Sequence, residues 1–470
     1  MDGAATREGS GRVPSESRFT SREWWILGAV GLGAFMAALD GSIVNVVVPV
    51  IGKQFHSPVA NVEWIVTIYL LVVSATLLTF GRLGDMQGHK RSYLAGFVVF
   101  AASSVVCGLA PSLVLLVAAR GVQAIGAAML YANSPAILTG AFPADVRGRV
   151  LGLQATMTYL GLTIGPPIGG WLAQAFTWRA VFYINIPISI AALLVGWRFI
   201  PSDAGSGRSE RFDLPGAATF SVGLVALLLV LDRGHAWGWT SALSLGLFAL
   251  ALVALAAFVR IERTAAYPML DLTLFADQRF TASTAAALLN YVAVYTLVFL
   301  MPFYLINGRG LSIATTGLVL ASQSLVMAVV APLSGALSDR LGARVLTSIG
   351  MFTLAVGLGM LGSLGPATPI AYVVAALAVC GLGTGVFIAP NNSALMGAAP
   401  KHRQGIASGM LAEARNVGMV LGVGMAGAIL ATLQRGNEVA GLFRGVSVSF
   451  YAAAAVALVG MFTAIFAPDA

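Results

Sequence analysis

Asp40, Arg120 and Glu413 are three of the ionisable side chains that lie deep inside otherwise apolar segments of this 470-residue chain. A charge at the centre of a membrane helix costs about 3 kcal/mol on insertion scales, so such groups are rare and usually functional. A carboxylate held there can bind and release a proton, and a neighbouring guanidinium can bias its pKa. These residue types make the three side chains candidates for proton-binding chemistry inside a membrane.

Asp40 and Arg120 are predicted to lie at similar depths. Asp40 stands nine residues before Pro49, roughly 14 Å from the outer end of its segment at 1.5 Å per residue. Arg120 stands about eight residues into a segment that descends from the outer side, roughly 12 Å deep. Two interpretations stay open: a structural ion pair or a polar group facing a wet cavity, and a carboxylate that carries a proton.

Glu413 and Arg415 fall near the middle of a later segment. Side chains two residues apart on a helix diverge by about 200°, so both cannot face one cavity directly. Glu413 is the candidate for a second protonatable or cation-binding carboxylate. A bond to a serine or backbone group of a neighbouring helix is the alternative, and Arg415 is expected to bond between helices.

The composition explains why these groups stand out. Hydrophobic residues make up 58% of the chain and charged residues only 10%, whereas soluble proteins carry roughly 25% charged residues. The mean hydropathy of +0.87 indicates a chain whose solvent is largely lipid. Cys107 and Cys380 both lie in apolar runs, which argues against a disulfide framework. The polar residues 1–23 resemble a disordered tail and lack the short apolar core of a signal peptide.

Apolar stretches predict an all-α membrane protein with 14 transmembrane helices, because about 20 such residues cross the hydrocarbon core. An even number of spans places both termini on one side, and basic residues favour the inner segments over the outer ones by roughly three to one. Both termini are therefore expected in the cytoplasm. The predicted spans are 26–49, 63–81, 92–110, 113–138, 149–173, 179–200, 215–232, 243–260, 280–306, 314–337, 344–363, 369–394, 405–432 and 446–467.

This distribution of basic residues also accounts for the net charge of +8 and the pI near 9.8. No basic patch with interleaved aromatic residues is visible, so no nucleic-acid partner is predicted. The expected partners are the lipid bilayer, protons and a small lipophilic molecule, with the chain functional as a monomer. No cofactor or metal is expected, because the four histidines fall in predicted loops without the spacing of metal ligands.

An internal repeat divides the chain. The segment at 81–91 resembles the one at 335–345 at an offset of 254, and glycines at 152, 161 and 165 recur at an offset of 257. Parallel repeats are a transporter architecture with the substrate site between the halves. The predicted parts are a disordered cytoplasmic tail (1–23), an N-terminal six-helix bundle (24–200), a cytoplasmic linker (201–214), two inserted helices (215–260) and a C-terminal six-helix bundle (280–467).

The charged segment GRLGDMQGHKR at 81–91 joins the second and third predicted spans on the inner face. Gly84 and Gly88 allow a tight turn and close backbone approach. Asp85 can accept bonds from neighbouring arginines or from the N-terminus of an adjacent helix. The segment is either a solvated loop that satisfies the positive-inside rule or a latch that holds the inner face closed in one state.

This segment resembles the loop signature of the major facilitator superfamily, G-x-L-x-D-x-x-G-x-[RK]-[RK]. In that family the aspartate joins a charge-relay latch that breaks as the halves rock, so the resemblance implies a cytoplasmic gate. The second copy is looser and also keeps Gly335 and Gly342. The residues implied in the gate are Gly81, Asp85, Gly88, Lys90 and Arg91 in the first copy, with Asp339 and Arg340 in the second.

Three further segments resemble signatures of the same superfamily. LDGSIVNVVVPVI at 39–51 is similar to the first-span signature of its fourteen-span drug:proton antiporters, with Ser42 in place of the usual threonine. Residues 115–130 resemble the fourth-span signature with its buried arginine, here Arg120. Residues 161–172 resemble the fifth-span antiporter signature, which implies a tightly packed helix favouring exchange over leak. Its residues here are Gly161, Gly165, Pro166, Gly169 and Gly170.

The resemblance implies the major facilitator fold and a multi-pass protein of the plasma membrane. It further implies a proton-coupled antiporter that exports lipophilic drugs or antibiotics by alternating access, with coupling roles for Asp40 and Arg120. A proton-coupled importer or facilitator of a small organic solute is the alternative. A membrane-bound enzyme is disfavoured for lack of a catalytic cluster, and the absence of a P-loop pattern argues against ATP as energy source. Embedded acids suit cationic substrates and protons equally, so the sequence leaves the substrate's charge open.

Overall fold

The computed structural model describes residues 20–143, 147–202, 213–264, 272–399, 404–433 and 439–465, and every regular element in these ranges is helical. The first half holds α1 (Ser21–Gln54), α2 (Val59–Val62), α3 (Trp64–Gln87), α4 (His89–Leu109), α5 (Leu113–Ala141), α6 (Arg147–Ala175), α7 (Ala180–Tyr183) and α8 (Asn185–Phe199). After these come α9 (Leu214–Trp237), α10 (Ala242–Thr264) and the short η1 (Leu272–Ala276). The second half holds α11 (Gln278–Pro302), η2 (Phe303–Gly308), α12 (Ile313–Leu341), α13 (Ala343–Gly362), α14 (Ile370–Ala398), α15 (Gln404–Leu433) and α16 (Val439–Ile465).

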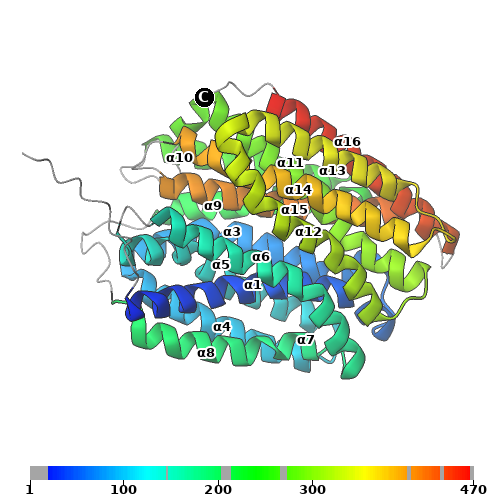
Figure 1. Ribbon diagram of the computed structural model, residues 1–470, viewed down its shortest axis with the longest axis horizontal. Helices are drawn as coiled ribbons and strands as arrows, with labels where there is room; N and C mark the ends of the chain where they lie inside the picture. The colour runs from blue at the N-terminus through cyan, green and yellow to red at the C-terminus, as the bar shows by residue number, and fades with distance from the viewer. Residues whose placement is uncertain are drawn as a thin grey trace, which may run out of the picture.

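The two halves are built by the same pairwise packing of helices. In the first half α1 packs on α6 and α8, while α5 packs on α3 and α4. In the second half α11 packs on α15 and α16, while α14 packs on α12 and α13. The two bundles lie one above the other in Figure 1, coloured blue to teal and yellow to red. The repeat read from the sequence therefore corresponds to two six-helix bundles.

In each half, the helix that forms the fifth span packs against the backbone of the first span through equivalent glycines. These pairs are α6 on α1 and α15 on α11. A Cβ at Gly161 in α6 would collide with the carbonyl oxygen of Phe35 in α1. A Cβ at Gly418 in α15 would collide in the same way with the carbonyl oxygen of Leu288 in α11. Small residues let helices approach closely in a membrane, where lipid is as apolar as leucine. The glycine spacing therefore repeats because a helix contact repeats.

Replacing Gly161 by alanine is expected to destabilise the first bundle. The added methyl meets backbone, which cannot rotate away, and overpacking of this kind costs roughly 1–3 kcal/mol. The melting temperature in detergent should fall by several degrees. Gly28→Ala is the matched control, because no atom lies within 4 Å of a Cβ at that position in α1. Equal melting temperatures for the two variants would contradict the packing argument.

The first helix begins earlier than the sequence predicted. Thr20 caps α1, and its side chain and that of Glu23 form a reciprocal capping box, which satisfies backbone donors at the helix start. Ser21, Arg22 and Glu23 are therefore helical, and the boundary of the tail predicted at residue 23 is wrong by a few residues. The rest of that tail, residues 1–19, lies outside the described residues, as does most of the predicted linker at 201–214.

Thirteen helical segments of the described residues are long and apolar enough to cross a bilayer. The remaining expected span is α6, which is 29 residues long but rich in glycine, threonine and proline. Because α6 packs along α1 of its own half and α12 of the other half, it lies inside the bundle with the other spans. The outward faces carry exposed apolar side chains, which suits contact with lipid.

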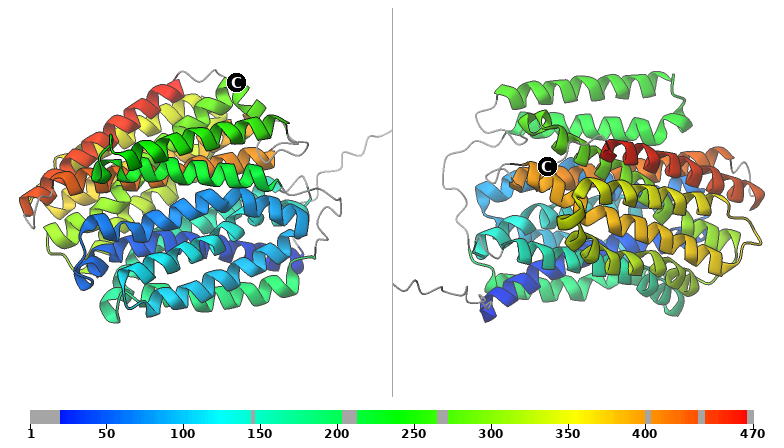
Figure 2. Two further views of the ribbon diagram at one scale, coloured as in Figure 1. Left: turned by 180° about the vertical axis from the view of Figure 1, so that it is seen from behind. Right: turned by 45° about the horizontal axis from the view of Figure 1, so that its top comes forward.

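The two inserted helices lie across the seam between the bundles. Helix α9 packs on α3 of the first half and on α15 of the second, and α10 packs on α9. Figure 2 shows this pair, in bright green, between the blue and the red helices when the molecule is seen from behind. The hydroxyl of Ser221 in α9 donates a hydrogen bond to the carbonyl oxygen of Ala75 at 2.6 Å, which fixes the insert to α3.

Candidate functional site

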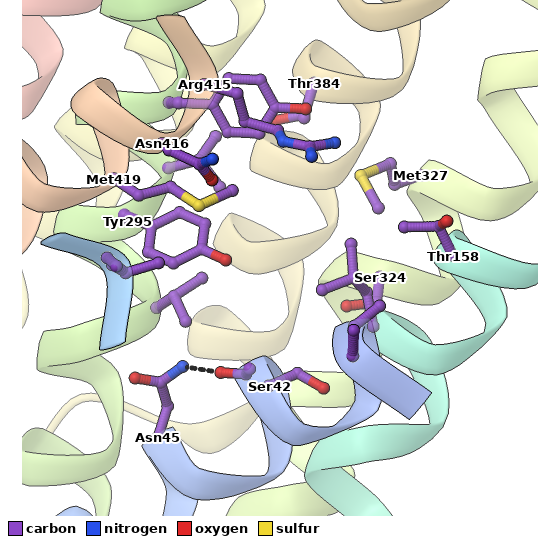
Figure 3. Close-up of a pocket in the computed structure, with 18 of the residues that line it drawn as sticks. Ser42, Asn45, Thr158, Tyr295, Ser324, Met327, Thr384, Arg415, Asn416 and Met419 are labelled. Carbon is purple, nitrogen blue, oxygen red and sulfur yellow. Dashed lines mark hydrogen bonds between the residues drawn. The ribbon is translucent and has the colours of Figure 1, made fainter. Parts of the chain in front are cut away.

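A cavity of about 230 Å³ lies between the two bundles. It is lined from the first half by α1, α3, α5 and α6, and from the second half by α11, α12, α14 and α15. Figure 3 shows Ser42 and Asn45 at one end of this cavity and Arg415 near the other. Pockets that bind small molecules are concave and largely apolar, with a few polar groups that fix orientation. This cavity is therefore the candidate substrate site.

The cavity is covered on its predicted outer side by contacts between the halves. The backbone amide of Ala314 in α12 donates to the side-chain carbonyl of Gln174 in α6 at 3.2 Å. Gly170 and Gly317 lie so close to the opposite backbone that a Cβ at either would collide with it. Gly170 belongs to the same fifth-span signature as Gly161, but it faces α12 and not α1. It lies one position out of step with Gly161, Gly165 and Gly169, which meet α1.

Asp40 and Arg120 form a buried ion pair inside the first bundle. Arg120 Nη1 donates to Asp40 Oδ2 at 2.5 Å, and the two residues are 1% and 0% exposed. Two side-chain amides also donate to this carboxylate: Gln123 Nε2 and Asn185 Nδ2 lie 3.1 and 2.7 Å from Asp40 Oδ1. These three donors, from α5 and α8, satisfy the carboxylate in its charged form.

Tyr69 lies between this ion pair and the central cavity. The guanidinium carbon of Arg120 lies 4.1 Å from the centre of the Tyr69 ring, and Tyr69 lines the cavity. Neither Asp40 nor Arg120 lines the cavity itself. The pair therefore faces neither lipid nor the substrate space.

Glu413 is buried in α15, and neither of its carboxylate oxygens has a hydrogen-bond partner among the described residues. The expected alternative, a bond to a serine or backbone group, is therefore not seen there. Glu413 shares a helix face with Gly409 and Gly427. Gly409 faces Leu78 of α3, and Gly427 faces the Glu63 carboxylate. Glu413 thus lies on the side of α15 that meets α3, in the seam between the halves.

Arg415 faces the central cavity, as the spacing from Glu413 requires. Its guanidinium lies 5.7 Å from the ring centre of Tyr131, which belongs to α5 in the opposite half. Figure 3 shows the side chain of Arg415 pointing into the cavity, with Met327 on the facing wall. The expected contact between helices is thus made with Tyr131 of α5 and, through a hydrogen bond, with the side chain of Tyr291 in α11.

The charged segment 81–91 consists of the last residues of α3, a turn at Gly88 and the first residues of α4. Gly84 is helical and approaches Asn133 and His89 closely, whereas Gly88 has a φ of 97° and makes the turn. The equivalent Gly342 has a φ of 82°. Glycine is required at both turns, because this conformation is strained for other residues.

The described contacts of Asp85 and Lys90 lie within their own half. Asp85 is half exposed and lies 3.3 Å from His89 Nε2, across the turn at Gly88, and it forms an ion pair with His89 when the imidazole is protonated. Lys90 Nζ donates to the carbonyl oxygens of Trp197 and Ile200 at the end of α8, at 2.9 and 2.6 Å. His89 had been predicted in a loop but is the first residue of α4. Gly81 faces Ala132, Arg91 and Arg340 are exposed, and the side chain of Asp339 lies outside the described part.

Replacing Asp85 by alanine is expected to slow transport several-fold and to leave the binding constant of the substrate nearly unchanged. Among the described residues Asp85 contacts His89 of its own segment, so its proposed latch role arises when the inner face closes. Transport rate and equilibrium binding should be measured on the same preparation. Asp85→Glu, which keeps the charge, should recover much of the rate. Weakened binding with an unchanged rate of cycling would contradict the latch.

One buried ion pair was missed by the sequence analysis. Arg233 falls just after the predicted span 215–232, but it lies inside α9 and pairs with Glu63 at 3.2 Å. It also donates to the carbonyl oxygen of Ala60 at 2.6 Å and lies over the Trp64 ring. The sequence shows Glu63 next to Trp64, but its pairing with Arg233 depends on where α9 packs against the first bundle. It fastens the inserted helices to the outer end of the first bundle.

The family profile described as Major Facilitator Superfamily matches residues 30–276 and 284–470. The chain belongs to the major facilitator superfamily. A solved structure titled as a bacterial homologue of the human lysosomal transporter Spinster, inward-facing and unoccupied, superimposes with a TM-score of 0.70. It covers 96% of this chain and 98% of that one at 15% identity, which supports the fold alone.

Curated relatives of this superfamily member are transporters. The riboflavin transporter RibZ of Clostridioides difficile is 32% identical, over 95% of this chain and 97% of that protein. The multidrug resistance protein Stp of Mycobacterium tuberculosis is 36% identical, over 86% and 75%. The tetracenomycin C resistance and export protein of Streptomyces glaucescens is 31% identical, over 88% and 77%. The protein is therefore a multi-pass transporter of the plasma membrane and not an enzyme.

Proposed function

We propose that this transporter exports lipophilic drug-like molecules in exchange for protons. The observation that carries the proposal is the buried Asp40–Arg120 pair, whose guanidinium lies on the ring of Tyr69, a residue of the cavity wall. An ion pair of this kind contributes little to stability by itself, because both charges are desolvated. The position of the pair beside a substrate cavity favours a role in proton coupling over a structural role. The relatives named for drug resistance and export support the choice of substrate.

The coupling step follows from the contacts of Asp40. A proton on the carboxylate removes the charge that holds Arg120, and the guanidinium then depends on Gln123 and the Ile65 carbonyl oxygen, to which it also donates. Because Arg120 lies on the ring of Tyr69, its displacement alters the wall of the cavity. Binding of a proton at Asp40 and binding of substrate in the cavity thereby become linked.

Glu413 supplies the second proposed proton site. A buried carboxylate without a charged partner is costly, whereas the neutral acid is tolerated in apolar surroundings. Because Glu413 lies in the seam between α3 and α15, rocking of the bundles at 24–200 and 280–467 changes its access to water. The tightly packed α6 has Gly161, Gly165 and Gly169 against α1 and the carbonyl of Pro166 against Gly317 of α12, and it keeps the path closed to leak during this motion.

The experiment uses inside-out membrane vesicles with an imposed pH gradient and a panel of lipophilic drugs. We expect gradient-driven accumulation of at least one drug and its collapse on addition of a protonophore. Accumulation that persists without a gradient would contradict proton coupling.

Import or facilitated passage of a small organic solute is the second candidate function. The riboflavin transporter RibZ favours a small organic solute as the substrate, because that relative aligns over nearly the whole length of both chains. The same vesicles distinguish the two functions, since an importer moves its solute in the opposite direction relative to the gradient.

A further inference from the structure

The described residues that line the central cavity include a single charged side chain, Arg415. No aspartate, glutamate or lysine is among the described residues that line this cavity. The other polar groups on the wall are neutral amides and hydroxyls. A molecule in this space therefore meets a positive charge and neutral hydrogen-bonding groups. The neutral polar groups are Ser42, Asn45, Thr158, Gln323, Ser324, Thr384, Asn392 and Asn416.

The nearby acids do not reverse the sign of this field. Asp40 is neutralised by Arg120 and lies behind Tyr69. Glu413 lies on the opposite side of α15 from Arg415, toward α3, and does not line the cavity. The Arg415 guanidinium lies 5.7 Å from the ring centre of Tyr131 and hydrogen-bonds the side chain of Tyr291, and tyrosine is a neutral partner in both contacts. The cavity is electrostatically suited to an anion or to an electron-rich oxygen.

The walls also favour flat molecules. Four tyrosines line the cavity: Tyr69, Tyr131, Tyr291 and Tyr295. Tyrosine offers a ring face for stacking together with a hydroxyl for hydrogen bonds. Met327 and Met419 lie on opposite sides of the space in Figure 3, and methionine adapts to ligands of different outline.

We propose that the cavity binds flat aromatic molecules that carry an acidic group, in preference to cations, with Arg415 as the anchor of the acid. The inference rests on the proposed function in taking this cavity as the substrate site. A guanidinium binds carboxylates and phenolates through charge-assisted hydrogen bonds. A cationic molecule of the same outline is rejected, because it would bring two like charges together away from bulk water.

The test uses three xanthene dyes that share one ring system and differ in charge. Fluorescein is acidic, its ether–ester derivative is neutral, and rhodamine 6G is cationic. Binding to the purified full chain in nanodiscs is measured by fluorescence anisotropy. We expect fluorescein to bind about tenfold or more tightly than rhodamine 6G, with the neutral dye between them. Tighter binding of rhodamine 6G than of fluorescein would overturn the proposal.

Variants of Arg415 identify the anchor. Arg415→Gln should weaken fluorescein binding about tenfold or more and change binding of the neutral dye less than about threefold. Arg415→Lys should keep the preference for the acidic dye. Arg260→Gln, which removes an exposed positive charge at the end of α10, is the matched control and should change neither. Equal weakening of all three dyes by Arg415→Gln would contradict the anchor role.

Transport separates this inference from the function on which it rests. Each dye is offered to vesicles with an imposed pH gradient. An acid preference in binding without gradient-driven transport would support the inference and contradict the antiport function. Gradient-driven transport of rhodamine 6G but not of fluorescein would support the antiport function and overturn the inference.

Discussion

Asp40→Asn should reduce gradient-driven export at least tenfold, because the residue proposed to carry the proton can no longer bind and release it. The substitution also leaves Arg120 buried without its charged partner, which costs about 3–5 kcal/mol. The melting temperature should therefore fall together with transport. Vesicle transport and thermal unfolding in detergent measure the two effects separately.

The double variant Asp40→Asn with Arg120→Gln distinguishes a proton carrier from a structural pair. Removing both charges should recover most of the lost stability, because no unpaired charge remains. Export should stay lost. Recovery of both stability and export would mean that the pair is only structural. Ser103→Ala is the control in a neighbouring helix, since its hydroxyl bonds only to carbonyl oxygens of its own helix, α4.

Glu413→Gln should separate exchange of substrate from its coupling to protons. Glutamine resembles the neutral acid in shape, so the seam between α3 and α15 should still pack. Exchange of labelled for unlabelled substrate should stay within about threefold, while gradient-driven accumulation falls at least tenfold. Glu262→Gln, in the inserted helix α10, controls for loss of a buried acid elsewhere. Full gradient-driven accumulation in the Glu413 variant would remove this residue from the coupling mechanism.

The sequence predicted the fold well because membrane helices follow local rules. Each span must satisfy its backbone hydrogen bonds internally, so apolar runs of sufficient length mark the helices. The repeat was visible because Gly161 and Gly418 each meet a backbone in the same place of their own half. The α6 helix shows the limit of hydropathy, since glycines and prolines needed for packing lower its apolar character.

The sequence predicted the site less completely, because the facing of a side chain depends on tertiary packing. Similar depth brought Asp40 and Arg120 into the same region, but nothing in the sequence indicated that Tyr69 lies between them and the cavity. Spacing alone showed that Glu413 and Arg415 diverge, without saying which of them faces the substrate space. Arg233 was left outside the predicted span 215–232 because a charge there ends the apolar run, whereas in the structure this charge is paired inside α9.

The most direct test of proton-coupled export follows protons and substrate together. The purified protein is reconstituted into liposomes that contain a pH-sensitive dye, with the membrane potential clamped, and substrate is added outside. Substrate that enters the lumen should drive protons out, so the account predicts that the lumen becomes more alkaline. An unchanged luminal pH during substrate entry, or acidification, would contradict exchange of substrate for protons.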